Sequence, residues 1–316
     1  MTYRTHVAAF LASAFVSGWV FYAMFDPAAA GPSLPGAPAQ PSVEPPPAEA
    51  AIQPRGRVYL FRGFAGVVFS RGMDRLAELI EQAGLKASVN EAVMCSSMAQ
   101  QAIADYRKGP VPITAIGHSM GAACALSFAG MLDAEHIPVS LVVTTDPAKI
   151  SDDVPANVER YINIFQSNSI LGGRDVKPGQ GFAGHYASYD LVRHADINHL
   201  NIEKDDSIHE QVVSKVLLLA ATPAKTDTET VPIRYVVPAD AIVQLWDSGM
   251  PVFAQPGDTL QTLATRYQVP LWSLSQMNPA ANGMLLPGQR ITVPRFLVPL
   301  PADGGGFVTG QTLPKH

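Results

Sequence analysis

Residues 117–121 read Gly-His-Ser-Met-Gly, and the rest of the chain is organised around this stretch. The residues before it, 111–116, form a short apolar run rich in β-branched side chains, which is typical of a buried strand. The residues after it, 122–129, are mostly small and predict a helix that can lie close against a sheet. A strand, a sharp turn and a helix in this order hold the hydroxyl of Ser119 clear of the surrounding backbone. The two glycines of the stretch remove Cβ atoms that would collide where the strand meets the helix.

The chain between residues 57 and 221 alternates strand-like and helix-like segments. Apolar, β-branched runs predict strands at 58–61, 87–93, 111–116, 139–144, 161–165 and 189–193. Helical periodicity and small-residue runs predict helices at 73–83, 96–106, 122–129 and 207–220. Alternating strands and helices predict an α/β fold, with a mostly parallel sheet and helices on both of its faces.

A serine nucleophile needs a base, and the base needs an acid that orients it. Asp146 directly follows the predicted strand at 139–144, which places it at the same edge of the sheet as Ser119. An alternative for this residue is a turn-initiating Asp-Pro pair. Asp175 and Asp190 are weaker candidates for the acid, because neither follows a clear core strand.

Between the candidate acid and residue 221 the sequence has four histidines: His185, His194, His199 and His209. The base is expected in the loop between the last strand and the closing helix, and His199 fits that place best. His194, closer to the strand, is the alternative base, whereas His209 already lies inside the predicted helix.

An oxyanion formed at the serine needs two N–H donors. The backbone N–H of Met120 lies at the start of the predicted helix, and the second donor is expected from the loop at 62–66. The N–H of Phe64 is our choice in that loop. Arg62 either holds the loop by an ion pair or meets an anionic group of the substrate. The glycine-rich stretch 166–184 either lines the substrate pocket or is only a mobile loop.

With these residues in place, 57–221 resembles an α/β-hydrolase of the lipase/thioesterase type. The matching positions are Ser119 in the sharp turn, Asp146 after the following strand and His199 before the last helix. The resemblance implies a serine hydrolase that cleaves a small acyl ester or thioester and needs no cofactor. The domain has no obvious large lid insertion, which argues against a true interfacial lipase.

Residues 251–295 predict a second, smaller unit with the order strand, helix, helix, strand. Its first helix is expected to begin after Asp258 as the N-cap. The unit resembles a LysM module, and the residues that carry the resemblance are Gly-Asp-Thr-Leu at 257–260, Leu-Ala-Thr-Arg-Tyr at 263–267, Asn-Pro at 278–279 and Leu-Pro-Gly-Gln-Arg-Ile at 286–291. The resemblance implies a helix pair on a two-stranded sheet and binding of N-acetylglucosamine-containing glycans such as peptidoglycan. The alternative is a small packing domain without affinity for glycans.

The N-terminal residues 7–25 form an unbroken uncharged stretch, long enough as a helix to span roughly 28 Å. Positive charge at the N-terminus and at Arg4, with Asp26 on the other side, predicts a cytoplasmic N-terminus and an exported body. We expect a retained membrane anchor. The alternative is a signal peptide cleaved near the alanines at 28–30, which would leave a secreted or periplasmic protein.

Composition excludes several classes of protein. The net charge of −5 over 316 residues includes no basic block, so a nucleic-acid partner is not expected. The histidines and cysteines are not spaced like a metal site, and no metal is expected. Cys95 and Cys124 are too few for a disulfide framework, although a bridge between them is an alternative in an oxidising compartment.

The sequence thus predicts six segments: 1–26, anchor or signal peptide; 27–55, linker rich in Pro and Ala; 56–222, hydrolase domain; 223–250, linker; 251–295, LysM module; 296–316, flexible tail. The predicted function is that of an exported, cell-wall-associated serine hydrolase. Two alternatives stay open at this point: a non-catalytic peptidoglycan-binding scaffold with a degenerate hydrolase domain, and an esterase or amidase that acts on the wall glycan itself.

Overall fold

The computed structural model describes residues 55–64, 66, 70–221 and 229–296. The predicted anchor, most of the linker that follows it and the tail lie outside these residues. In the described part of the chain, no helix combines the length and the apolar character that crossing a membrane requires.

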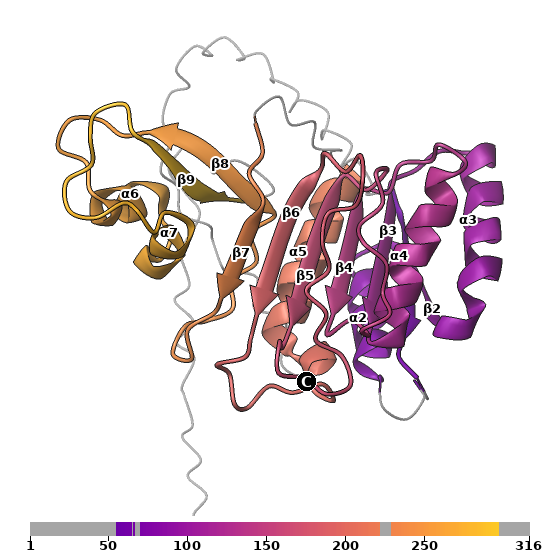
Figure 1. Ribbon diagram of the computed structural model, residues 1–316. Helices are drawn as coiled ribbons and strands as arrows, with labels where there is room; N and C mark the ends of the chain where they lie inside the picture. Colours follow the sequence, from indigo (N-terminus) through magenta and orange to yellow (C-terminus); the bar gives the residue numbers. More distant parts are fainter. Residues whose placement is uncertain (1–54, 65, 67–69, 222–228, 297–316) are drawn as a thin grey trace, which may run out of the picture. The chain divides into compact units, whose positions relative to one another are not determined.

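Seven strands form one sheet in the order β2-β1-β3-β4-β5-β6-β7 (Figure 1). All neighbouring strands are parallel, which confirms the predicted sheet. The strands are β1 Arg57–Arg62, β2 Lys86–Glu91, β3 Ile113–His118, β4 Leu141–Thr145, β5 Arg160–Phe165, β6 His185–Asp190 and β7 Ile233–Val236. The predicted strand at 189–193 begins earlier than expected, at His185. The last strand, β7, lies within residues 223–250, which were predicted to be a linker.

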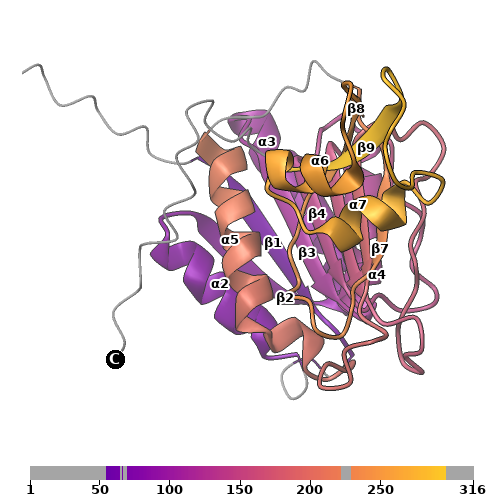
Figure 2. The same ribbon diagram turned by 90° about the vertical axis from the view of Figure 1, so that its left-hand side faces the viewer.

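Both faces of the sheet are covered, which explains why its strands are apolar almost throughout. Helices α2 Gly72–Gln82 and α5 Asp206–Ala221 lie on one face, and α3 Cys95–Lys108 and α4 Met120–Asp133 lie on the other (Figure 2). Side chains of each strand alternate between the two cores: Leu60 packs with α2 and α5, whereas Phe61 packs with α4.

Loops replace helices over part of the α4 face. The connections from β4 to β5 and from β5 to β6 contain no helix in their described residues, 146–159 and 166–184. Val154 and Val176 from these loops are completely buried, and they belong to the same core as Tyr161 and Tyr186 of the sheet. Helical cover of this face is therefore partial, and the loops that complete it begin at the carboxyl edge of the sheet.

The smaller unit pairs β8 Ser248–Phe253 with β9 Arg290–Arg295 in an antiparallel sheet. Its helices are α6 Leu260–Tyr267 and α7 Leu271–Met277, as the pattern predicted. The predicted N-cap is wrong by one residue. Thr259 caps α6, and it exchanges hydrogen bonds with Thr262 in a capping box. Asp258 instead pairs with Arg266, with 2.5 Å between Oδ1 and Nη2.

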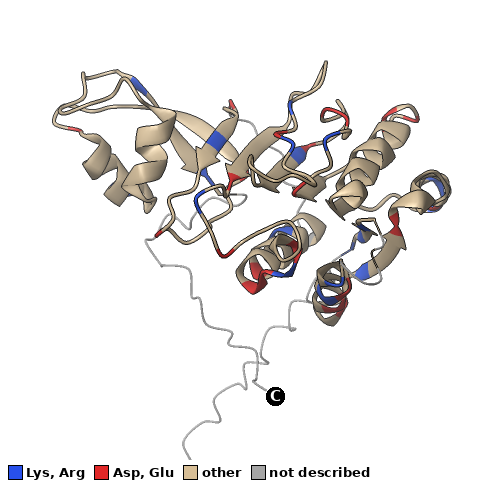
Figure 3. Cartoon of the chain, turned by 60° about the horizontal axis from the view of Figure 1, so that its bottom comes forward, with Lys and Arg blue, Asp and Glu red and all other residues tan. Residues whose placement is uncertain are grey.

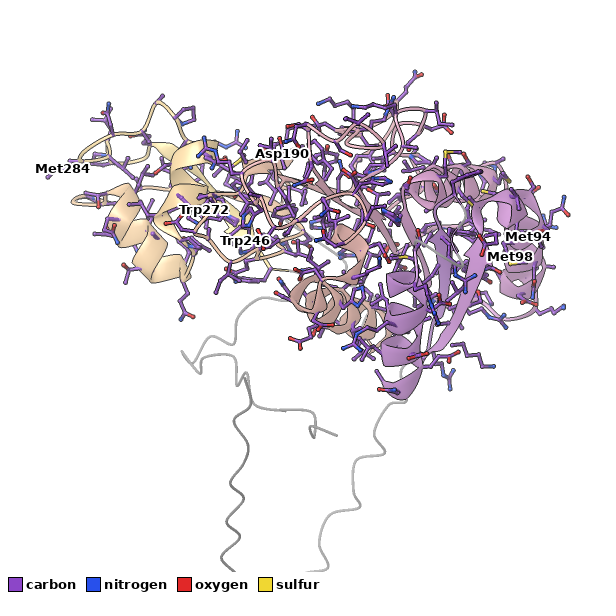
Figure 4. The ribbon with its side chains drawn as sticks, turned by 90° about the horizontal axis from the view of Figure 1, so that it is seen from below. Met94, Met98, Asp190, Trp246, Trp272 and Met284 are labelled. Atoms are coloured by element: carbon purple, nitrogen blue, oxygen red, sulfur yellow. The ribbon has the colours of Figure 1, made fainter. Side chains whose placement is uncertain are left out.

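Specific contacts join the smaller unit to strand β7. The side-chain amide of Gln276 on α7 accepts a hydrogen bond from the N–H of Val236 at 2.9 Å and donates one to its carbonyl oxygen at 2.8 Å. The rings of Tyr235, Trp246 and Trp272 pack together, with centroids 5.3 to 6.0 Å apart, and Figure 4 labels the two tryptophans of this aromatic cluster. An edge strand with free N–H and C=O groups invites pairing with another chain, and Gln276 occupies one such pair of groups.

Candidate active site

The turn after β3 holds Ser119 in a conformation that residues other than glycine rarely adopt. Its φ is 56° and its ψ is −118°. The close approach of strand and helix explains the two glycines of the motif. A Cβ at Gly117 would lie 2.2 Å from the carbonyl oxygen of Gly121, and a Cβ at Gly121 would lie 2.0 Å from that of Phe61. Strain of this kind persists where the surrounding structure imposes it, and it clusters at functional sites.

Asp146 and His199 meet at the carboxyl edge of the sheet. Asp146 follows β4 directly, has a positive φ of 43° and is completely buried. The Nδ1 atom of His199 lies 2.5 Å from Oδ2 of Asp146. Because the carboxylate only accepts, Nδ1 carries the proton, and in the neutral ring Nε2 keeps a free lone pair.

Ser119 lies at the same edge of the sheet as this pair, because β3 and β4 are parallel neighbours. Among the residues that the structure describes, the Ser119 hydroxyl forms no hydrogen bond to His199. Such bonds are often long in unliganded enzymes and tighten when substrate binds. The roles of the three residues in catalysis therefore stay a prediction.

Two further residues hold Asp146 in place. The backbone N–H of Gln166 donates to Oδ1 at 3.0 Å, and the hydroxyl of Ser169 donates to Oδ2 at 2.7 Å. Burial raises the pKa of Asp146, but the hydrogen bonds from His199, Ser169 and Gln166 outweigh it and leave this pKa below its ordinary value. The carboxylate is therefore charged at neutral pH and can orient an imidazole.

The side chain of Gln166 also secures the loop that carries His199. Its Nε2 lies 2.6 Å from the carbonyl oxygen of Ile197, and it contacts the carbonyl oxygens of Leu191 and His194 at 3.3 and 3.2 Å. One residue thus fixes both the acid, through its backbone, and the approach to the base, through its side chain.

Gly172 belongs to the same loop and lies against the pair. A Cβ there would come 2.7 Å from Oδ2 of Asp146 and 3.0 Å from Nδ1 of His199. Sequence reasoning left the segment 166–184 open between a pocket lining and a mobile loop. Its glycines were the only feature of the sequence that pointed to a role for this segment.

The two predicted oxyanion donors follow β3 and β1, which are neighbouring strands of the sheet. Met120 is the first residue of α4, so its N–H belongs to a helix N-terminus next to Ser119. Phe64 follows β1, and 85 % of its side chain is exposed. Its neighbour Gly63 lies against the serine, since a Cβ at Gly63 would be 3.1 Å from the Cβ of Ser119. The donor roles of Met120 and Phe64 stay predictions.

Arg62 pairs with acidic groups of the protein. Its Nη1 lies 2.8 Å from Oε1 of Glu91, and its Nε and Nη2 bind Asp74. These hydrogen bonds, chiefly those that Arg62 donates to Asp74, raise the pKa of Arg62. Of the two predicted roles, the structure therefore shows the ion pair that holds the loop.

The two alternative acids bind other groups of the protein. Asp175 pairs with Lys177 and Arg234, and Asp190 accepts the N–H groups of Ser167 and Val192. The ring of His194 forms no hydrogen bond to a carboxylate in the described part of the chain.

The two cysteines are free thiols. The thiol of Cys95 lies 3.0 Å from the carbonyl oxygen of Cys124. No group of three or more metal-ligating side chains is found among the described residues. Figure 3 shows acidic and basic residues mixed along α2 and α5.

Comparison with known proteins identifies the smaller unit. Residues 254–294 match the family model of the LysM domain, which confirms the predicted module. No curated protein matches the chain.

Two solved structures are similar to the larger part. One, from Xanthomonas campestris pv. campestris, is assigned to the α/β-hydrolase superfamily; it is 16 % identical, covers 52 % of this chain and 96 % of its own, and has a TM-score of 0.33. The other is YbtT, a type II thioesterase of the yersiniabactin pathway, crystallised as a serine-to-alanine variant; it is 10 % identical, covers 56 % of this chain and 97 % of its own, and also has a TM-score of 0.33. The α/β fold is therefore assigned from the order and direction of the seven strands.

Proposed function

We propose that this chain is a serine hydrolase that cleaves an ester or a thioester and is held at the cell wall by its LysM domain. The observation that carries the proposal is the strained serine of the sharp turn, at the same sheet edge as a buried aspartate bonded to a histidine. A serine needs this kind of base and orienting acid to act as a nucleophile.

In the proposed reaction, Oγ of Ser119 attacks the carbonyl carbon while Nε2 of His199 takes the hydroxyl proton. Asp146 keeps the proton on Nδ1 and stabilises the imidazolium that forms. The N–H groups of Met120 and Phe64 bind the oxyanion of the tetrahedral intermediate. His199 then gives its proton to the leaving alcohol or thiol, and a water molecule releases the acyl group from Ser119 by the same steps.

Exposed apolar side chains support an acyl substrate. Phe64, Ile150, Ile170, Leu171 and Leu200 are all exposed, and they belong to loops that begin at the carboxyl ends of the strands. An apolar rim around a polar catalytic group suits a substrate whose acyl part is hydrophobic and whose carbonyl is polar.

The LysM domain supports a wall location, because modules of this family bind N-acetylglucosamine-containing glycans. Only three of the residues at 254–294 are charged, namely Asp258, Arg266 and Arg290, which suits an uncharged sugar ligand. Export of the body, with residues 7–25 as a retained anchor, is part of the proposal. Cleavage near residues 28–30 is its alternative.

The test compares the full chain with the Ser119→Ala and Ser127→Ala variants. Ser127 is the matched control, because it lies on the same helix α4 and, among the described residues, its hydroxyl bonds only to Asp152. We expect wild type and Ser127→Ala to hydrolyse p-nitrophenyl esters and to react with a fluorophosphonate probe, and Ser119→Ala to do neither. Equal turnover by Ser119→Ala would exclude the mechanism, and an unreactive wild type would favour the scaffold.

The LysM domain also favours one variant of the activity, in which the wall glycan itself is the substrate. Incubation of wild type with purified peptidoglycan distinguishes the two. Release of acetate or peptide that depends on Ser119 would indicate an esterase or amidase that acts on the wall. Binding without release, together with turnover of acyl esters, would indicate a separate acyl substrate.

A further inference from the structure

His118 is the last residue of β3 and directly precedes the candidate nucleophile, and only 2 % of it is exposed. Its two ring nitrogens contact two different loops. Nδ1 is 2.8 Å from the hydroxyl oxygen of Ser70, and Nε2 is 2.9 Å from the carbonyl oxygen of His199. The two imidazole rings themselves pack with their centroids 4.8 Å apart. The residue next to the serine therefore touches the backbone of the candidate base.

The chemistry of the partners fixes the position of the proton on this ring. A carbonyl oxygen only accepts, so Nε2 of His118 must carry a hydrogen and donate it to His199. Burial lowers the pKa of His118 to about 4, so the ring is neutral at neutral pH and its Nδ1 is an acceptor. The hydroxyl of Ser70 consequently donates to Nδ1.

Ser70 extends the contact to the loop after β1. Its hydroxyl oxygen accepts the backbone N–H of Gly63 at 3.1 Å, while its hydrogen goes to His118. Gly63 immediately precedes Phe64, the proposed oxyanion donor, and it lies against Ser119. Every donor and acceptor in this chain of hydrogen bonds is satisfied in a single arrangement.

We propose that His118 is a positioning residue, which holds the backbone of His199 through Nε2 and the oxyanion loop through Nδ1 and Ser70. The inference rests on the proposed function, since it assigns to one side chain the alignment of base and oxyanion donor relative to Ser119. Misplacement of a catalytic group by about 1 Å can cost a factor of about 100 in rate. Replacement of a side chain that holds two loops at once is therefore expected to lower the reaction rate strongly.

Two substitutions test separately the contact of Nδ1 with Ser70 and the contact of Nε2 with His199. The carboxamide of His118→Asn can take the place of Nδ1 but cannot reach the carbonyl of His199, whereas that of His118→Gln can take the place of Nε2. We expect His118→Asn to lower kcat about 30-fold with KM nearly unchanged, and His118→Gln to recover kcat to within about fivefold of wild type. Ser70→Ala, which releases Gly63, is expected to lower kcat about 10-fold.

Asn157→Ala is the matched control for lost side-chain hydrogen bonds. Asn157 donates to the carbonyl oxygens of Ala129 and Ile137, at the opposite end of α4 from Ser119. Its removal is expected to lower Tm without changing kcat. If His118→Asn, compared at matched Tm loss, has the kcat of Asn157→Ala, or if His118→Gln recovers nothing, the inference is wrong.

Hydrogen exchange gives a readout that does not depend on activity. His118→Asn is expected to speed amide exchange at residues 198–201, and Ser70→Ala to speed it at Gly63. Unchanged exchange at both places would overturn the inference even in an inactive protein. Failure of the proposed function looks different, because wild type would then show no turnover that depends on Ser119.

Discussion

The LysM domain and the carboxyl edge of the large sheet are assembled in different ways. The domain is closed by elements that follow one another within 248–295, and its outermost strands pair residue by residue from Ser248 with Arg295 to Phe253 with Arg290. The candidate site instead joins residues far apart in sequence, since Asp146 and His199 are separated by 53 positions. The comparison teaches that short-range patterns specify the binding module, whereas the site depends on how seven strands are ordered.

The largest expected effect tests the long-range part of this comparison. Asp146→Asn keeps the shape of the side chain but replaces the carboxylate that holds the proton on Nδ1 of His199. We expect kcat for an acyl ester to fall by roughly 10⁴-fold with the fold retained. Asp175→Asn is the control, because Asp175 is also paired but lies outside the candidate site, and its kcat should stay within about threefold. An Asp146→Asn enzyme with wild-type kcat would remove Asp146 from the mechanism.

A pair of glycines compares the two regions by stability. Gly121→Ala forces a Cβ to within 2.0 Å of the backbone oxygen of Phe61, so the free energy of unfolding should fall by about 3 kcal/mol or more. Gly257 of the LysM domain has open space around it but a φ of +88°, and Gly257→Ala should cost about 1–2 kcal/mol. Urea denaturation of both variants measures the difference. Equal losses would mean that the strand-helix contact relaxes freely.

The pH dependence of stability should come from the sheet domain, because residues 254–294 contain no histidine. Burial lowers the pKa of His118 to about 4 and that of His185 to about 3, and it also lowers the pKa of His209. Below pH 6.5 the unfolded chain binds protons at these histidines that the folded chain does not bind. Their contribution to stability is therefore fully present above pH 6.5 and is lost as the pH falls toward 4. His118 and His185 each contribute a slope of about 1.4 kcal/mol per pH unit in this range.

Two buried carboxyl groups oppose this trend, since burial raises the pKa of Asp247 as well as that of Glu203. Burial raises the pKa of Glu203 to about 6, so its contribution to stability grows as the pH falls through 6. Urea denaturation at pH 7, 6, 5 and 4.5 measures the net slope. In His118→Asn the slope should be smaller by about 1.4 kcal/mol per unit. An identical slope in the variant would show that His118 is not the buried neutral group described above.

The smallest expected effect concerns the contact between the two regions. Gln276→Ala removes both hydrogen bonds to Val236 at the edge of β7, and it should lower the free energy of unfolding by about 1–2 kcal/mol. Gln261→Ala, on the exposed side of α6, is the control and should change it by less than about 0.5 kcal/mol. Equal stability of the two variants would mean that water replaces Gln276 at the strand edge without loss.

Patterns in the sequence predicted the features that depend on neighbouring residues. The turn at Ser119 and the alternation of strands and helices are local, and chain order together with strand ends then indicated Asp146 and His199. Gln166 and Ser169 could not be found this way, because their contacts with Asp146 depend on the path of a loop without periodicity.

The local sequence also left some alternatives open, such as which residue caps α6. Asp258 and Thr259 are both good N-caps, and the engagement of Asp258 with Arg266 leaves Thr259 to cap α6. The role proposed for His118 was hidden for a similar reason. Any residue is permitted at its place in the Gly-x-Ser-x-Gly pattern, and its partners come from two distant segments.

The aromatic cluster beside β7 provides a tryptophan fluorescence signal. Trp246 and Trp272 are two of the three tryptophans in the chain, and their rings lie 6.0 Å apart between the sheet and the LysM domain. Indole fluorescence shifts to longer wavelength when the ring meets water. Because the third tryptophan is Trp19, emission from the full-length Trp19→Phe variant would report on this junction alone. Such a signal comes from a place remote from the chemistry at Ser119, and it allows detachment of the LysM domain to be followed separately from loss of turnover.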